Sequence, residues 1–156
     1  MITEISDVII RLGLAAVVGA LIGINRDLTR KPMGSRTLAL VALGAATVAI
    51  AAVRAPGIGE DADALSRVIQ GIVQGVMGGI SFIGAGVILR NPAARSVDGL
   101  TTAAAVWATA ALGIACALGE WILVMVGTFV ALVILAIPSV AVRSGLSPDD
   151  RDATDD

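Results

Sequence analysis

Long runs of apolar residues alternate with short polar segments along the chain. A helix that crosses a bilayer needs about 20 mainly apolar residues, because lipid leaves no water to bond exposed backbone groups. Five stretches meet this requirement: Ile5–Ile24, Thr37–Val53, Val68–Leu89, Leu100–Leu118 and Trp121–Val142. The pattern therefore predicts an all-α fold, an integral membrane bundle of five transmembrane helices.

The same pattern divides the chain into a membrane domain, residues 1–142, and a short acidic tail, residues 143–156. The tail has few of the apolar residues that order a segment, which predicts disorder. The N-terminus carries Glu4 and Asp7 where a cleaved signal peptide has basic residues. We therefore expect the first apolar run to be retained as a helix.

Positive charges gather on alternate connections between the apolar runs. One side of the predicted membrane holds Arg26, Arg30, Lys31, Arg36, Arg90, Arg95, Arg143 and Arg151. The other side holds Arg54 and Arg67, accompanied by several acids. An excess of Lys and Arg marks the cytoplasmic side. The charge pattern thus predicts an outside N-terminus and a cytoplasmic C-terminus.

Arg11 is a strong charge inside an apolar run. At mid-bilayer an arginine costs about 2.5–3.5 kcal/mol. Asp7 lies four residues earlier, on the same helix face. The spacing predicts an ion pair near the membrane surface, with a functional intramembrane charge as the alternative.

Composition supports a membrane protein and excludes several soluble classes. The chain is 56% hydrophobic and 15% charged, with a mean hydropathy of +0.90. Its net charge of −2 gives no basic field for nucleic acid. The chain has no histidine, which excludes His-based general bases and His-ligated zinc. We expect no cofactor, and Cys116 lies within an apolar run with no activating base in view.

Small residues recur every four positions on two of the predicted helices. Close backbone approach through such faces supplies the van der Waals contact that drives helix association in lipid. The helix-packing residues predicted in this way are Gly19, Gly23, Gly71, Gly75 and Gly79. The third helix carries most of them and is expected at the centre of the bundle. Its Gln70 and Gln74 should bond to a neighbouring helix, or else line a polar path.

Three motifs, in this order and spacing, resemble those of the MgtC/SapB family of membrane proteins. The first is Gly19–Asp27 (GALIGINRD) followed by Pro32–Thr37 (PMGSRT). The second is Gly79–Gly86 (GISFIGAG), and the third is Val97–Ala104 (VDGLTTAA). In the first motif the family usually has Glu where this chain has Asn25 and Asp27. In the third motif the family often has a basic residue where this chain has Asp98.

The resemblance implies a multi-pass protein of the bacterial inner membrane. Family members are associated with growth at low magnesium, survival inside macrophages and control of the F-type ATP synthase. Longer members usually have an additional soluble C-terminal domain, whereas the three motifs of this chain all lie in the predicted membrane domain. The resemblance therefore favours a regulator that binds membrane lipid and another inner-membrane protein. A homo-oligomer is a possible further assembly.

Two other functions remain as alternatives. The first is an oligomeric transporter of magnesium or another small ion. Magnesium prefers oxygen ligands, and the candidate acids all lie near membrane edges: Asp7, Asp27, Asp98 and Glu120. Inward-facing carboxylates would favour transport, whereas Arg–Asp pairs would oppose it. The second alternative, an intramembrane enzyme, lacks a visible pair of nucleophile and base, so no catalytic residue is predicted.

Polar residues of the two cytoplasmic motifs form the predicted functional cluster. Its members are Arg26, Asp27, Arg36, Thr37, Asp98, Thr101 and Thr102. Each also has a structural interpretation, because arginine sets topology and Asp98 or a threonine can cap the fourth helix. We further predict that Arg36 pairs with Asp27 or Asp98. Whether the cluster binds a metal is left open.

Overall fold

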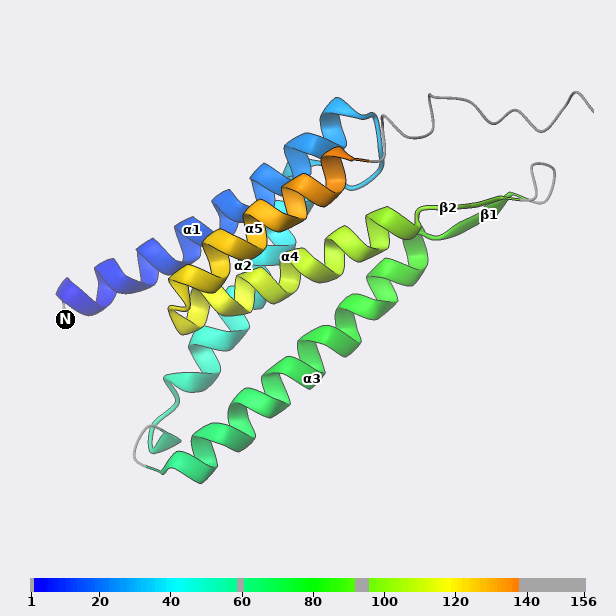
Figure 1. Ribbon diagram of the computed structural model, residues 1–156. Coiled ribbons are helices and arrows are strands. Elements are labelled where there is room, and N and C mark those ends of the chain that lie inside the picture. The colour runs from blue at the N-terminus through cyan, green and yellow to red at the C-terminus, as the bar shows by residue number, and fades with distance from the viewer. Residues whose placement is uncertain (1, 59–60, 92–95, 138–156) are drawn as a thin grey trace, which may run out of the picture.

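The computed structural model describes residues 2–58, 61–91 and 96–137, which form a helical bundle (Figure 1). The helices are α1 (Ile2–Leu28), α2 (Ser35–Val53), α3 (Ala62–Val87), α4 (Leu100–Leu118) and α5 (Trp121–Ala136). The first four are long and apolar enough to cross a membrane, and α5 is a shorter apolar helix of 16 residues. The prediction of a bundle of five helices is confirmed, with four of them long and apolar enough to span a membrane. A fifth membrane span and the orientation of the termini stay predictions.

Several helix boundaries differ from the predicted ones by two to six residues, and the largest differences are at the end of α1 and the start of α3. Helix α1 continues past Ile24 to Leu28, so that Arg26 and Asp27 belong to its last turn and not to a loop. Helix α3 begins six residues before the predicted Val68, because the Asp61 side chain accepts the Asp63 backbone N–H at 2.9 Å and caps it. The predicted end of the fifth helix at residue 142 and the tail 143–156 lie outside the described residues.

A small β-hairpin connects α3 to α4, where the sequence predicts only a loop. Strand β1 (Leu89–Asn91) pairs antiparallel with β2 (Ser96–Asp98). Gly99 then turns the chain into α4 with a φ of +90°. A Cβ at this position would overlap the Val87 carbonyl oxygen, so the return of the chain requires glycine.

Helix α4, and not α3, is the centre of the bundle. It contacts α1, α2, α3 and α5. In its most apolar stretch 61% of residues are buried, against 17% for α3. The prediction that the third helix is central is therefore wrong. The α3 glycines at 71, 75 and 79 have nothing within 4 Å of an added Cβ. Figure 1 shows α3 at the edge of the molecule.

Close packing in the interior depends on glycine and alanine. Added Cβ atoms at Gly19 and Gly23 of α1 would overlap the backbone of α2, and one at Gly113 of α4 would overlap the backbone at Ala42. The buried residues around these crossings include Ala15, Ala42, Ala46, Ala49 and Ala110, all fully buried. Small side chains allow α1, α2 and α4 to approach closely, as expected for helices in lipid.

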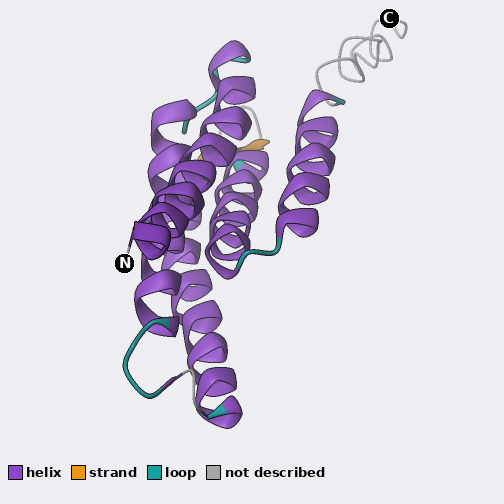
Figure 2. Cartoon of the chain, turned by 90° about the vertical axis from the view of Figure 1, so that its left-hand side faces the viewer, coloured by secondary structure: helices purple, strands orange, loops and turns teal. Residues whose placement is uncertain are grey.

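Large apolar side chains cover the outside of the bundle. Phe82 is 85% exposed, Ile122 75% and Phe129 68%. A soluble protein rarely exposes so much apolar surface, whereas a membrane provides a matching solvent. Helix α5 lies at one side of the bundle (Figure 2) and contacts only α4 and α1 extensively.

Candidate functional site

Arg26 occupies the interior of the bundle at the end where α1 stops and α4 starts. Its side chain is 1% exposed, and its Nη2 donates a hydrogen bond to the hydroxyl of Thr102, which is 2% exposed. Arg26 lies in the last turn of α1, and Thr102 lies in the first turn of α4. Two members of the predicted cluster, 76 residues apart, are thus in direct contact.

The buried guanidinium of Arg26 is only partly satisfied. Its Nε is buried and has no hydrogen-bond partner. No described acid forms an ion pair with it. Removing water from a charged group costs several kcal/mol unless polar partners replace it. The Thr102 hydroxyl therefore stabilises the buried guanidinium of Arg26, which has few other hydrogen-bond acceptors among the described residues.

Asp27 holds the start of α2. Its carboxylate accepts the backbone N–H of Ser35 at 2.9 Å. The first N–H groups of a helix have no partner within the helix, so this carboxylate acts as a cap supplied by the preceding helix. The fit requires glycine at position 34, because a Cβ there would overlap the Asp27 carboxylate.

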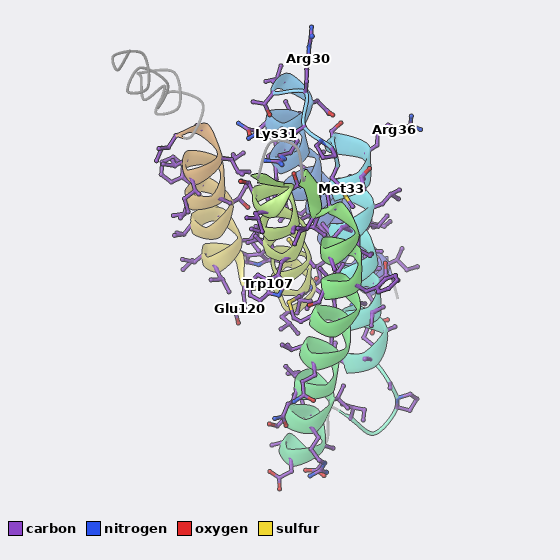
Figure 3. All side chains as sticks on the ribbon, turned by 90° about the vertical axis from the view of Figure 1, so that its right-hand side faces the viewer. Arg30, Lys31, Met33, Arg36, Trp107 and Glu120 are labelled. Atoms are coloured by element: carbon purple, nitrogen blue, oxygen red, sulfur yellow. The ribbon has the colours of Figure 1, made fainter. Side chains whose placement is uncertain are left out.

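Arg36, Thr37 and Thr101 lie at the same end, and their side chains make no such contact among the described residues. Arg36 and Thr37 in the first turn of α2 are exposed, as is Thr101 of α4. Figure 3 shows Arg36 reaching away from the helices. No ion pair joins Arg36 to Asp27 among the described side chains. The side chain of Asp98 lies outside the described part, so its pairing with Arg36 stays a prediction.

Sequence reasoning missed the burial of Arg26 and the cap on α2. The positive-inside pattern treats every arginine at this end alike, although Arg26 is buried and Arg36 is exposed. One usable signal in the sequence was the position of Arg26, three residues after the predicted packing residue Gly23. The structure places Gly23 against the α2 backbone at Ser35. A residue about one helical turn later on the same face also points inward.

A second polar cluster lies at the opposite end of α1. Arg11 Nε pairs with Asp7 at 2.8 Å, which confirms the predicted ion pair. Arg54, the residue that follows α2, pairs with the other oxygen of Asp7 at 2.8 Å. Arg11 Nη1 also donates to the Ala117 carbonyl at 2.7 Å, and its guanidinium lies 5.5 Å from the ring centre of Trp121. Arg11 therefore connects α1 to the end of α4 and the start of α5.

The open face of α3 is the other unusual feature. Gly71, Gly75 and Gly79 lie along it with no neighbour within contact distance of an added Cβ. Gln70 and Gln74 are exposed, and neither forms a side-chain hydrogen bond within the described part of the chain. The predicted bonds from these amides to a neighbouring helix are thus not formed with the described helices of this chain, and the alternative, a polar path, stays a prediction.

Metal and thiol chemistry have little support in the described residues. Within residues 2–58, 61–91 and 96–137, no three His, Cys, Asp or Glu side chains gather as metal ligands would. Cys116 is fully buried in α4. A buried thiol of this kind is usually inert.

Comparison with known proteins agrees with the motifs. A model of the MgtC family matches residues 12–143. Protein SrpB of Synechococcus elongatus is 46% identical over 134 residues, covering 81% of this chain and 71% of SrpB. Protein MgtC of Salmonella typhimurium is 37% identical over 124 residues, covering 80% of this chain and 49% of MgtC. Protein SapB of Bacillus subtilis is 33% identical over 113 residues, covering 72% and 48%. The matched region is thus about half of the last two relatives, and no solved structure matches.

Proposed function

The chain belongs to the MgtC family of multi-pass membrane proteins, and from that premise we propose that it is a bacterial inner-membrane regulator that acts by binding another membrane protein. In this proposal its N-terminus lies outside and its C-terminus in the cytoplasm, as the charge pattern predicts. The partner is an integral membrane complex such as the F-type ATP synthase, and the setting is adaptation to low magnesium. The proposed role is not enzymatic.

The observation that carries the proposal is the unoccupied face of α3. Gly75 and Gly79 leave the backbone open, and the amides of Gln70 and Gln74 are exposed beside them. In hydrocarbon an amide without a partner is costly, whereas a hydrogen bond to another helix removes that cost. A transmembrane helix from a partner can approach the glycines closely and bond to the amides.

The alternative, an oligomeric transporter of magnesium or another small ion, has weaker support. Magnesium transport needs oxygen ligands along a path through the bilayer. Asp7 is paired with two arginines, and Asp27 caps α2 at the end of the bundle. These acids are engaged near helix ends. In the part of the chain that the structure describes, the exposed amides of α3 favour a polar path between subunits of an oligomer.

Substitution on the open face of α3 tests the proposal. Gly75→Leu fills the space that a partner helix would use, and Gly13→Leu is the matched control because Gly13 of α1 is equally open. The tagged protein is co-expressed with the F-type ATP synthase and purified in mild detergent. We expect recovery of the synthase with wild type and Gly13→Leu, and its loss with Gly75→Leu. Equal recovery with both variants, or no recovery with wild type, would argue against this partner and this face.

Transport is measured separately with purified protein in proteoliposomes. The proposal predicts magnesium uptake no faster than in empty vesicles. Protein-dependent uptake that falls in Asp27→Asn would support the transporter alternative instead. Correct insertion is checked by protease access to the tail, so that an inactive preparation is recognised.

A further inference from the structure

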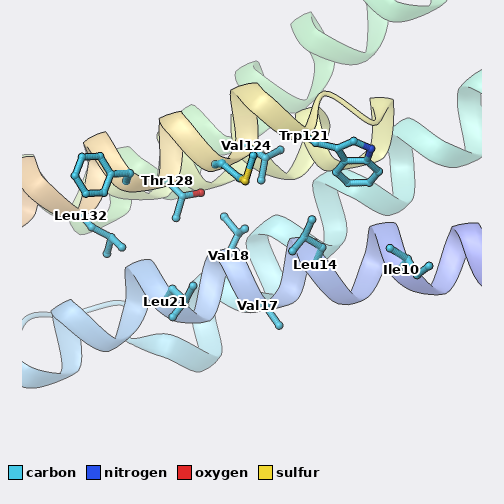
Figure 4. Close-up of a pocket in the computed structure, with 11 residues that line it drawn as sticks. Ile10, Leu14, Val17, Val18, Leu21, Trp121, Val124, Thr128 and Leu132 are labelled. Carbon is cyan, nitrogen blue, oxygen red and sulfur yellow. The ribbon is translucent and has the colours of Figure 1, made fainter.

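An apolar groove of about 610 Å³ runs between α1 and α5 (Figure 4). Ile10 and Trp121 line one end, and Leu21 and Leu132 lie toward the other. Its walls consist almost entirely of hydrocarbon side chains. The groove exists because α5 packs less extensively against α1 than α2 does.

The groove reaches through about half of a bilayer. Its lining residues extend from Ile10 to Leu21 on α1 and from Trp121 to Leu132 on α5. At a rise of about 1.5 Å per residue, each wall is about 16 Å long. The hydrocarbon region of a bilayer is about 30 Å thick, so that one leaflet contributes about 15 Å. This length matches an acyl chain of one leaflet, whereas a partner helix would need to cross both.

Charged residues place one end of the groove at the membrane surface. Arg11 lies over the Trp121 ring, and Glu120 in the turn before α5 is exposed. Arg11 uses Nε for Asp7 and Nη1 for the Ala117 carbonyl. In the described part of the chain, Arg11 Nη2 and the Trp121 indole N–H have no hydrogen-bond acceptor. Two donors are therefore available where a lipid headgroup meets its acyl chains.

We propose that this groove binds a phospholipid, with one acyl chain between α1 and α5 and the phosphodiester at Arg11 and Trp121. A phosphodiester offers only acceptor oxygens, which complement these two donors. Asp7, Arg11, Arg54 and Glu120 at this end carry no net charge together, so the selection of a phosphodiester depends on the two free donors and not on a positive field. The bound chain fills the space between α5 and α1 and thereby holds α5 against the bundle.

Native mass spectrometry of the full, delipidated chain in detergent tests this site. The probes are dioleoylphosphatidylglycerol, dioleoylglycerol, which lacks the phosphate, and glycerophosphate, which lacks the chains. Val17→Phe fills the groove without touching the polar cluster. Val126→Phe is the matched control, because Val126 is 55% exposed and Val17 53%, and Val126 does not line the groove.

Wild type and Val126→Phe should each retain one phosphatidylglycerol, and Val17→Phe should bind it about tenfold more weakly, a change of about 1.4 kcal/mol. Dioleoylglycerol should bind more weakly than phosphatidylglycerol, and glycerophosphate should not bind. Trp121→Phe removes one donor and should reduce the preference for phosphatidylglycerol over dioleoylglycerol. Equal lipid binding by the two valine variants would overturn the proposal. So would conversion of a dimer to a monomer by Val17→Phe, because the groove would then hold a second copy of the chain.

Discussion

Arg26 on α1 donates a hydrogen bond to Thr102 on α4, and both side chains are almost fully buried. The contact joins the first and third family motifs in space. It also fixes the start of α4, the helix around which the other four pack. A charged group inside the bundle thus contributes to the position of the central helix.

Removing the hydroxyl of Thr102 should destabilise the protein. Thr102→Val keeps the size of the side chain but leaves the buried Arg26 without its acceptor. An unsatisfied buried donor costs about 1–3 kcal/mol, and more when it is charged. We expect a lower Tm in detergent, measured as thermal unfolding by intrinsic tryptophan fluorescence. Thr101→Val is the matched control, because Thr101 is exposed. An equal Tm for the two variants would contradict the stabilising role of the contact.

Local patterns predicted the features that depend on neighbouring residues. The apolar runs identified all five helices, because lipid requires each to satisfy its own backbone. The spacing of four residues between Asp7 and Arg11 predicted their ion pair, because such residues share a helix face. These contacts lie within a single helix, where sequence distance and spatial distance correspond.

Features that depend on which helices meet were not predictable in the same way. Gly19 and Gly75 occur in the same small-residue pattern, yet only Gly19 meets another helix of the chain. Arg26 and Arg36 both belong to basic segments, yet only Arg26 is buried. The small-residue spacing indicates that a helix face permits close approach, but it does not identify the helix that packs against that face. The β-hairpin before α4 was missed because its strands have only three residues each.

Gly34 and Asp27 should be energetically coupled. Gly34→Ala places a methyl group against the Asp27 carboxylate and displaces the cap of α2. Loss of a helix cap typically costs about 0.5–2 kcal/mol. In an Asp27→Ala background the same glycine substitution should cost less, because the obstructing carboxylate and the cap are already absent. A double-mutant cycle of unfolding free energies measures this coupling. Strict additivity of the two substitutions would contradict it.

Glycines of the central helix α4 and the edge helix α3 should differ in their tolerance of alanine. Gly113→Ala introduces a Cβ that overlaps the α2 backbone at Ala42, so the two helices must separate. Overpacking of this kind costs about 1–3 kcal/mol. Gly71→Ala on α3 meets no atom and should be neutral or slightly stabilising, because alanine favours a helix. Thermal unfolding of both variants in the same detergent compares them. A larger loss of stability for Gly71→Ala would indicate that α3 packs differently.

Arg11 and Arg54 share one carboxylate, but their substitution should have unequal effects. Arg54 is 43% exposed on its side chain, and its ion pair with Asp7 is the one it forms among the described residues, so Arg54→Gln removes a surface pair worth about 0–1 kcal/mol. Arg11 contacts Asp7, the Ala117 carbonyl and the Trp121 ring, and so connects three helices. Arg11→Gln should therefore lower the Tm more than Arg54→Gln. It should also shift the Trp121 fluorescence in a Trp107→Phe background, because the cation above the ring is removed. An unchanged emission spectrum, or equal losses of stability, would show that Arg11 does not hold α5 to the bundle.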